Sequence, residues 1–302
     1  MVEARCFQYD AATAMAQGRR DRQEDAVATL FPPGLGLGCV VLADGMGGHA
    51  SGHVASAVVV REMLRALSLH ARDAAGLERD VGAILHAALE RANDRVARLA
   101  SDWPDLRGMG ATLVAPVLVD NRLYWISVGD SPLYLLRGAR MARLNQEHSL
   151  AGRMERLVSR GLLARHEADN HPDRDCLTSV VLGKAIPEID CQHLPLRLLH
   201  GDILIAASDG LQFLDETRIA ALVHEHRDTT SAEIAARLMQ EIRDLDDPDQ
   251  DNVSICIVKI RQPVQPSCET AHEAGQAQDM AAMPPPAAER TLTRPPNLWK
   301  EA

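Results

Sequence analysis

Four aspartates of this chain stand where apolar, strand-like runs begin or end: Asp44 after CVVLA, Asp130 after YWISVG, Asp209 after ILIAAS and Asp251 before VSICIV. A carboxylate at the end of a buried strand is costly in free energy unless a positive charge meets it. Lys and Arg are absent from the stretches that carry three of the four, namely 31–60, 198–217 and 244–258. Local ion pairs therefore do not explain three of these acids.

A shared divalent cation with oxygen ligands is the economical explanation, and such ligands favour Mg²⁺ or Mn²⁺ over zinc. Each aspartate alone also has a plainer interpretation. Asp-Gly after a strand is a common turn, Asp130 and Asp209 could each cap a turn, and Asp251 is one of five acids in DLDDPDQDN. The four together, in matching strand contexts, favour the metal site.

Strands and helices come in blocks along the chain. Strand-like runs occupy 39–43, 112–119, 122–128, 133–137, 202–208 and 253–260. Apolar residues at three- and four-residue spacing predict helices over about 52–68, 77–100, 147–160, 215–226 and 231–243. Turn residues at hairpin spacing predict an antiparallel meander between 112 and 137. This block arrangement predicts α+β layering rather than a doubly wound sheet.

Composition excludes several classes of protein. The 302 residues carry a formal charge of −10 and only 3% aromatic side chains, so a nucleic-acid binder held by phosphate contacts or base stacking is not expected. No apolar run is long enough for a membrane span, and the N-terminus does not resemble a secretory signal. The six cysteines are scattered, which favours reduced side chains over disulfides or a zinc site. We therefore expect an acidic cytoplasmic protein.

The composition changes near Arg261. Residues 262–302 hold seven of the sixteen prolines and show no periodic apolar pattern. We predict one domain over 1–261, followed by a disordered Pro/Ala-rich tail over 262–302. Leu298 and Trp299 near its end are either a docking peptide or, more simply, part of a solvated end.

A basic and acidic motif, GRRDRQEDA, precedes the first of these strand-like runs. Arg20 lies four residues before Glu24 and five before Asp25. A guanidinium can hold two oxygens of a phosphate, and a neighbouring carboxylate can fix its orientation. The alternative is a surface turn rich in charge.

Eight segments of the chain carry a family resemblance and occur in the family's order: GRRDRQEDA, VLADGMGGHASG, GMGATLVAPVL, WISVGDSPLYLLR, LNQEHSL, LTSVVLG, ILIAASDGL and DQDNVSICIV. In these segments the chain resembles the bacterial metal-dependent protein phosphatases of the PP2C or PPM family. The resemblance covers about residues 8–260. It implies an α+β fold of four layers, α/β/β/α, in which two packed antiparallel sheets are flanked by helices.

The resemblance also implies a metal site with two or three Mn²⁺ or Mg²⁺ ions. Asp44 would bridge two ions, Asp209 and Asp251 would complete the first site, and the Gly45 carbonyl would serve the second. Asp130 matches the ligand of a third, weaker ion seen in many bacterial members.

Substrate contacts are implied in the same way. Arg20 matches the residue that binds the substrate phosphate, Glu24 matches the acid that holds metal-bound water, and Asp25 would support these groups from behind. The expected reaction is hydrolysis of phosphoserine and phosphothreonine on proteins by a metal-activated water, with no covalent phosphoenzyme. We expect a monomer whose partners are phosphorylated proteins and a cognate bacterial Ser/Thr kinase.

Two other functions compete with this one. A catalytically weak scaffold of the same fold would bind phosphoproteins, but the intact Asp44, Asp209 and Asp251 argue against it. Segment 145–180 matches the flap, a substrate-selecting element beside the family's active site. A phosphatase of the sporulation or stress-response type would usually lack the Arg20-like residue and the flap, and this sequence has both.

The chain departs from the family pattern at a few positions. Gln23 stands where many bacterial members have Asn, and its amide can serve similarly. Pro132 replaces an Arg that is common after the GDS motif, which removes a cation beside Asp130. Met46 occupies the position of a histidine in eukaryotic members. His49 and His53 have the spacing of a zinc pair, but we expect supporting or structural roles for both.

Overall fold

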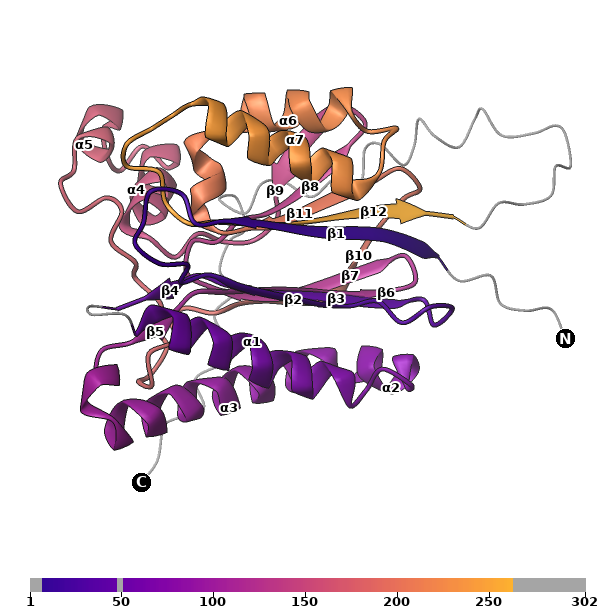
Figure 1. Ribbon diagram of the computed structural model, residues 1–302, viewed down its shortest axis with the longest axis horizontal. Coiled ribbons are helices and arrows are strands. Elements are labelled where there is room, and N and C mark those ends of the chain that lie inside the picture. Colours follow the sequence, from indigo (N-terminus) through magenta and orange to yellow (C-terminus); the bar gives the residue numbers. More distant parts are fainter. Residues whose placement is uncertain (1–6, 48–50, 263–302) are drawn as a thin grey trace, which may run out of the picture.

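Two antiparallel sheets lie face to face in the computed structural model, which describes residues 7–47 and 51–262. Helices cover the outer face of each sheet, so the molecule has four layers (Figure 1). The predicted α+β sandwich is therefore confirmed. Among the described residues, no helix is long and apolar enough to cross a membrane.

The first sheet has the order β1–β12–β11–β8–β9. Its strands are β1 (Gln8–Ala16), β12 (Val253–Arg261), β11 (Ile203–Ala207), β8 (Leu133–Arg137) and β9 (Arg140–Arg143). The second sheet has the order β10–β7–β6–β3–β2. Its strands are β10 (Asp190–Arg197), β7 (Arg122–Val128), β6 (Leu113–Val119), β3 (Leu37–Ala43) and β2 (Ala26–Leu30), and a short ladder pairs β4 (Gly45–Met46) with β5 (Gly110–Ala111).

Amphipathic helices form the outer layers. The second sheet is covered by α1 (Gly52–Ser68), α2 (Ala74–Arg79) and α3 (Val81–Asp102), and the first by α6 (Glu216–Glu225) and α7 (Ser231–Asp244). Two further helices, α4 (Leu150–Ser159) and α5 (Arg165–Asp169), stand at one end of the sandwich (Figure 1). Two 3₁₀ turns, Pro104–Leu106 and Asp209–Phe213, complete the described elements.

The layers enclose three apolar cores. One lies between the sheets, and one lies between each sheet and its helices. Central strands are therefore buried on both faces: every residue of β3 and of β6 is buried. This burial explains why CVVLA and TLVAPVLV are continuous apolar runs instead of alternating ones.

The structure adds several elements to those predicted, among them four longer strands, and it corrects two of the predicted helices. The strands β1, β2, β9 and β10 were not predicted, because their residues are only partly buried and show no clean alternation. The helix predicted over 77–100 is two helices, with Asp80 between them. The helix predicted from 147 begins at Leu150, because the Ser149 hydroxyl accepts a hydrogen bond from the Gly152 amide and caps it.

Candidate active site

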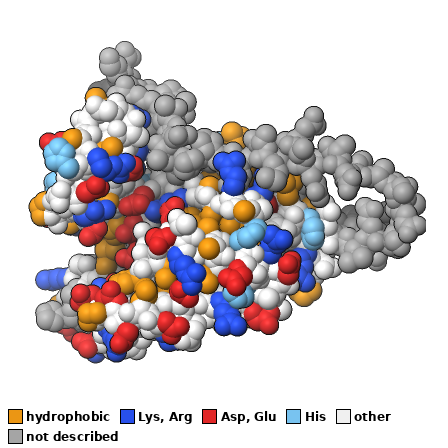
Figure 2. Space-filling model, turned by 90° about the horizontal axis from the view of Figure 1, so that it is seen from above, with side chains coloured by type: hydrophobic (Ala, Val, Ile, Leu, Met, Phe, Trp, Pro, Cys, Tyr) orange, Lys and Arg blue, Asp and Glu red, His pale blue; other side chains and the backbone are white. Residues whose placement is uncertain are grey.

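One cavity of about 1070 Å³ opens where the aspartate-bearing strand ends meet. Figure 2 shows acidic side chains in a recess at the left of the molecule. The predicted site residues that line the cavity are Arg20, Glu24, Asp44, Gly45, Asp130, Asp209 and Asp251. Asp25 does not line the cavity; its side chain is buried behind the others.

Thr112 holds two of the aspartate-bearing segments together. Its hydroxyl oxygen accepts a hydrogen bond from the Asp44 amide at 2.9 Å and shares one with the Ser131 hydroxyl at 2.7 Å. Its own amide donates to the Asp44 carbonyl at 2.8 Å. Because Ser131 follows Asp130, this one side chain joins the end of β3 to the turn after β7. Sequence analysis did not single out Thr112.

The carboxylates raise one another's pKa. Burial raises the pKa of Asp44 well above its usual range, and the charges of Asp209, Asp25 and Asp130 raise it further. Burial and the Asp209 charge raise the pKa of Asp130 to about 7. Burial and Asp251 raise the pKa of Asp209, although a hydrogen bond with Asp44 lowers it. Without a cation, this cluster favours protonated acids.

Arg20 lies against one of the proposed metal ligands. Its guanidinium donates to Asp251 Oδ2 at 2.6 Å, across 231 residues of sequence. Gly18 makes this approach possible: its φ is +63°, and a Cβ there would lie 2.2 Å from the Asp251 carbonyl oxygen. The absence of nearby Lys and Arg excludes only local pairing, and this long-range ion pair was not predicted from the sequence.

Asn252 fixes the loop that carries Arg20. Its side-chain oxygen accepts from the Glu24 amide at 2.7 Å, and its nitrogen donates to the carbonyls of Gln17 and Arg22 at 2.8 and 2.9 Å. A single amide side chain can make all three bonds because it carries both donors and an acceptor. The sequence carries no signal for this role, although Asn252 directly follows Asp251.

Glu24 and the Gly45 carbonyl converge at the start of α1. A Cβ placed on Gly52 would lie 2.7 Å from the Gly45 oxygen and 2.8 Å from Glu24 Oε2. Only glycine fits between these two oxygens, which explains the glycine of the ASG sequence. The Ser56 hydroxyl donates to the Glu24 carbonyl at 2.5 Å and holds the loop against the helix.

Asp25 supports the site from inside the sandwich. The Ser208 hydroxyl donates to Asp25 Oδ2 at 2.8 Å, and Ser208 immediately precedes Asp209. Burial raises the pKa of Asp25 to about 6. Its Oδ1 atom is buried without a hydrogen-bond partner, as is Asp209 Oδ1.

These residues fit a divalent cation. Buried carboxylate oxygens without partners, close enough to raise one another's pKa, are stabilised by a hard positive charge. Over 7–47 and 51–262, no three His, Cys, Asp or Glu side chains form a preformed cage. Instead, the Arg20 guanidinium contacts the Asp251 carboxylate.

Residues 15–245 match the sequence model of the family described as Protein phosphatase 2C. The chain belongs to the protein phosphatase 2C family. This protein phosphatase 2C chain is 34% identical over 189 residues to the serine/threonine protein phosphatase PstP of Mycobacterium tuberculosis; the match covers 62% of this chain but 34% of that protein. It is 31% identical to the serine/threonine phosphatase stp of Listeria monocytogenes, covering 62% of this chain and 72% of that protein.

A solved structure shares this fold. The catalytic domain of PstP in complex with two manganese ions superimposes with a TM-score of 0.65 and 28% identity, covering 85% of this chain and 99% of that one. The family and the four-layer fold predicted from sequence are confirmed.

The segment 145–180 borders the cavity of this protein phosphatase 2C chain. Its wall residues are Asp175, Cys176, Leu177 and Val180. Met46 also lines the cavity, whereas His53 is exposed on α1 and does not.

The structure also places Gln23 and four of the six cysteines. The Gln23 side chain donates to the Ala16 carbonyl and accepts from the Asp25 amide, so it braces the loop. The described cysteines, Cys39, Cys176, Cys191 and Cys256, are free. The other two cysteines, His49 and the tail from 263 onward lie outside the described residues.

Proposed function

We propose that this chain hydrolyses phosphoserine and phosphothreonine monoesters on proteins with the help of two divalent cations, and that it opposes a bacterial Ser/Thr kinase. The observation that carries the proposal is the convergence of Arg20 with Asp44, Asp209 and Asp251 around one cavity. The relatives named as serine/threonine phosphatases support the choice of substrate.

The cations would be held by oxygen atoms only. Asp44, Asp209 and Asp251 supply carboxylates, and Gly45 supplies its carbonyl oxygen; Asp130, on the same cavity, would hold a third ion. When bound, such cations supply a nucleophilic water at neutral pH and neutralise charge on the phosphoryl group.

Arg20 would bind the phosphate. One N–H group of its guanidinium is engaged with Asp251, and a guanidinium has five donors. The Arg20 side chain is 59% exposed, so the remaining donors can reach a phosphoserine or phosphothreonine that enters from solvent. The planar fork suits two phosphate oxygens at once.

Glu24 would orient the attacking water. Its Oε2 atom lies beside the Gly45 carbonyl oxygen, and its backbone is held by Asn252 and Ser56. Because both its backbone amide and its backbone carbonyl are held, Glu24 loses less freedom when its carboxylate accepts a hydrogen bond from water. Asp25 and Ser208 would keep the neighbouring Asp209 in place.

Phosphate release from a phosphothreonine peptide tests the proposal. The wild-type chain should release phosphate with added Mn²⁺ or Mg²⁺, and excess EDTA should abolish the release until the metal is restored. A phosphotyrosine peptide of the same sequence serves as the substrate control, and Asp44→Asn as the enzyme control. Equal release with EDTA, or equal release by Asp44→Asn, would refute a metal-dependent activity at this cavity.

A further inference from the structure

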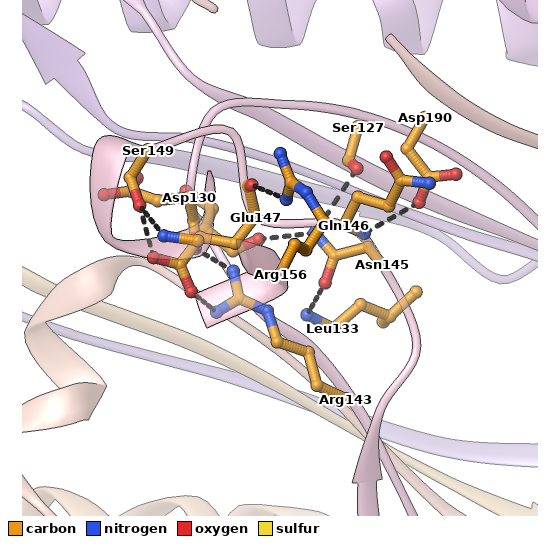
Figure 3. A network of polar contacts seen from close by, with 12 residues as sticks. Ser127, Asp130, Leu133, Arg143, Asn145, Gln146, Glu147, Ser149, Arg156 and Asp190 are labelled. Atoms are coloured by element: carbon orange, nitrogen blue, oxygen red, sulfur yellow. Dashed lines mark hydrogen bonds and ion pairs between the residues drawn. The ribbon is translucent and has the colours of Figure 1, made fainter. Parts of the chain in front are cut away.

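A polar network connects the turn that carries Asp130 to the start of α4 (Figure 3). Arg143, the last residue of β9, is at its centre. One end of its guanidinium donates to the Asp130 carbonyl oxygen, and the other pairs with Glu147 Oε2 at 2.6 Å. The Arg143 side chain is only 13% exposed, so this ion pair is largely shielded from solvent.

Glu147 passes the connection on to α4. Its Oε1 atom accepts a hydrogen bond from the Ser149 hydroxyl, whose oxygen in turn accepts from the Gly152 amide at 3.0 Å. Arg156, one turn further along α4, donates to the Glu147 carbonyl at 3.1 Å. The first turn of the helix is therefore fixed to Glu147.

His148 makes a second, parallel connection. Its amide donates to the Gly129 carbonyl at 2.9 Å, and its ring Nδ1 accepts from the Gly129 amide at 3.2 Å. Two adjacent residues of one turn, Gly129 and Asp130, are thus tied to two adjacent residues of another, Glu147 and His148. The turn and the helix start must move together.

The cavity wall is hydrogen-bonded to the same segment, residues 148–150. The Leu150 amide donates to the Cys176 carbonyl at 2.9 Å, the Thr178 amide donates to the His148 carbonyl at 2.8 Å, and Ser149 forms a β-bridge with Leu177. Cys176 and Leu177 line the cavity. Anything that displaces Glu147 therefore displaces the wall that a protein substrate would meet.

We propose that the Arg143–Glu147 pair positions the Asp130 turn and the 175–180 wall relative to each other, and so sets the affinity of the site for protein substrates. The inference rests on the proposed phosphatase function. It also accounts for Pro132: the cation that the sequence lacks after the GDS motif is supplied in space by Arg143. Neither residue lines the 1070 Å³ cavity, and Arg143 does not line the adjoining cavity of about 290 Å³ either, whereas Glu147 lines that smaller cavity beside Asp130 and Asp209. The bonds of both side chains go to protein groups, so we assign both as positioning residues.

Two variants separate positioning from general stability. Arg143→Met keeps an unbranched apolar side chain and removes both contacts, and Glu147→Gln removes the charge. Each should raise KM for a phosphothreonine peptide by about tenfold, the size expected for the loss of one partly buried charged contact. The kcat/KM for p-nitrophenyl phosphate, which is too small to touch the wall, should fall much less. Because the two residues act as one unit, the double variant should be no worse than the poorer single variant. Arg143→Lys should recover part of the loss.

A matched control lies in the same segment. Arg165 of α5 makes two bonds to Glu155 of α4, and the pair connects these helices only to each other. Arg165→Met should leave both substrates at wild-type values.

A second measurement does not depend on activity. Hydrogen exchange of the α4 amides in the metal-free protein should be about five- to tenfold faster in Arg143→Met and Glu147→Gln, because each variant loosens Glu147, whose Oε1 atom holds the Ser149 hydroxyl that caps the first turn. Amides of β3 should not change. Unchanged amide exchange rates in α4 would overturn the inference. So would an equal loss of kcat/KM on the phosphothreonine peptide and on p-nitrophenyl phosphate, or effects of the two single variants that add up in the double variant. If the wild type releases no phosphate from either substrate, the proposed function fails, and the exchange result still decides the coupling.

Discussion

Arg20 donates a hydrogen bond to Asp251 at 2.6 Å and so joins the loop after β1 to the start of β12. If Asp251 binds a cation as proposed, Arg20 and that cation would compete for the same carboxylate.

Arg20→Ala should separate phosphate binding from metal binding. We expect KM for a phosphopeptide to rise by about tenfold or more, because a charged phosphate contact is lost. The affinity for Mn²⁺, measured by calorimetry, should stay the same or increase, since Asp251 is released. Arg19→Ala is the matched control, because the neighbouring Arg19 pairs with the exposed Asp246 outside the cavity. Weaker Mn²⁺ binding with an unchanged KM would instead make Arg20 a structural support.

Asp209→Asn and Asp251→Asn should each lower kcat by orders of magnitude at saturating Mn²⁺, because each removes a proposed ligand charge. Metal-free Asp209→Asn should nevertheless melt at a higher temperature than the wild type, because repulsion within the buried acid cluster is reduced. Metal-free Asp251→Asn should gain less, because it also loses the ion pair with Arg20. Differential scanning fluorimetry in EDTA measures this. Wild-type turnover in both variants would show that the site has been placed wrongly.

The metal-free protein should lose stability as the pH rises from about 6.5 to about 8. The pKa of Asp130 is raised to about 7 and that of Asp44 higher than its usual range, so the folded state binds protons that the unfolded chain has already released. Carboxyl groups whose pKa is higher in the folded state than in the unfolded chain stabilise the fold at low pH. This contribution to stability disappears as the pH rises through their folded pKa values.

His148 changes the stability with pH in the opposite direction. Burial lowers its pKa to about 4, so its contribution is lost as the pH falls below about 6.5. The contribution of His148 to stability is therefore nearly constant between about pH 6.5 and about pH 8. Melting temperatures in EDTA across that window should fall for the wild type, fall less for Asp130→Asn, and recover when Mg²⁺ is added. A flat profile for the wild type would contradict the pKa shifts.

The tail stays a prediction, because residues from 263 onward lie outside the described part of the chain. A chain ending at Gln262 retains every described strand and every proposed ligand. Its peptide turnover and melting temperature should match those of the full chain. Failure to fold, or loss of most turnover, would show that the tail packs on the domain.

Sequence periodicity predicted the helices and central strands because their burial is one-sided or complete. The α1 helix over Gly52–Ser68 coincides with its predicted range. Strand β1 escaped prediction because QYDAATAMA is half-buried at a sheet edge, where small residues carry no alternating signal.

The four aspartates that line the cavity could be singled out from the sequence because a run of buried apolar residues that ends in an acid is unusual in itself. The supporting groups were not. Thr112 and Asn252 are common polar residues whose partners lie 68 and 228 residues away, at Asp44 and Glu24. Only the folded chain brings such groups together, and for the same reason a search for nearby cations did not find the Arg20–Asp251 pair.

Mn²⁺ binding to the purified, chelator-treated chain tests the central claim most directly. Calorimetry should show at least two ions bound per chain, as in the manganese complex of PstP, with Mg²⁺ competing for the same sites. Asp44→Asn should lose this binding while retaining the wild-type fold by circular dichroism. A wild-type chain that binds no Mn²⁺, or an Asp44→Asn chain that binds it equally well, would contradict the assignment of the four-aspartate cavity as a metal site.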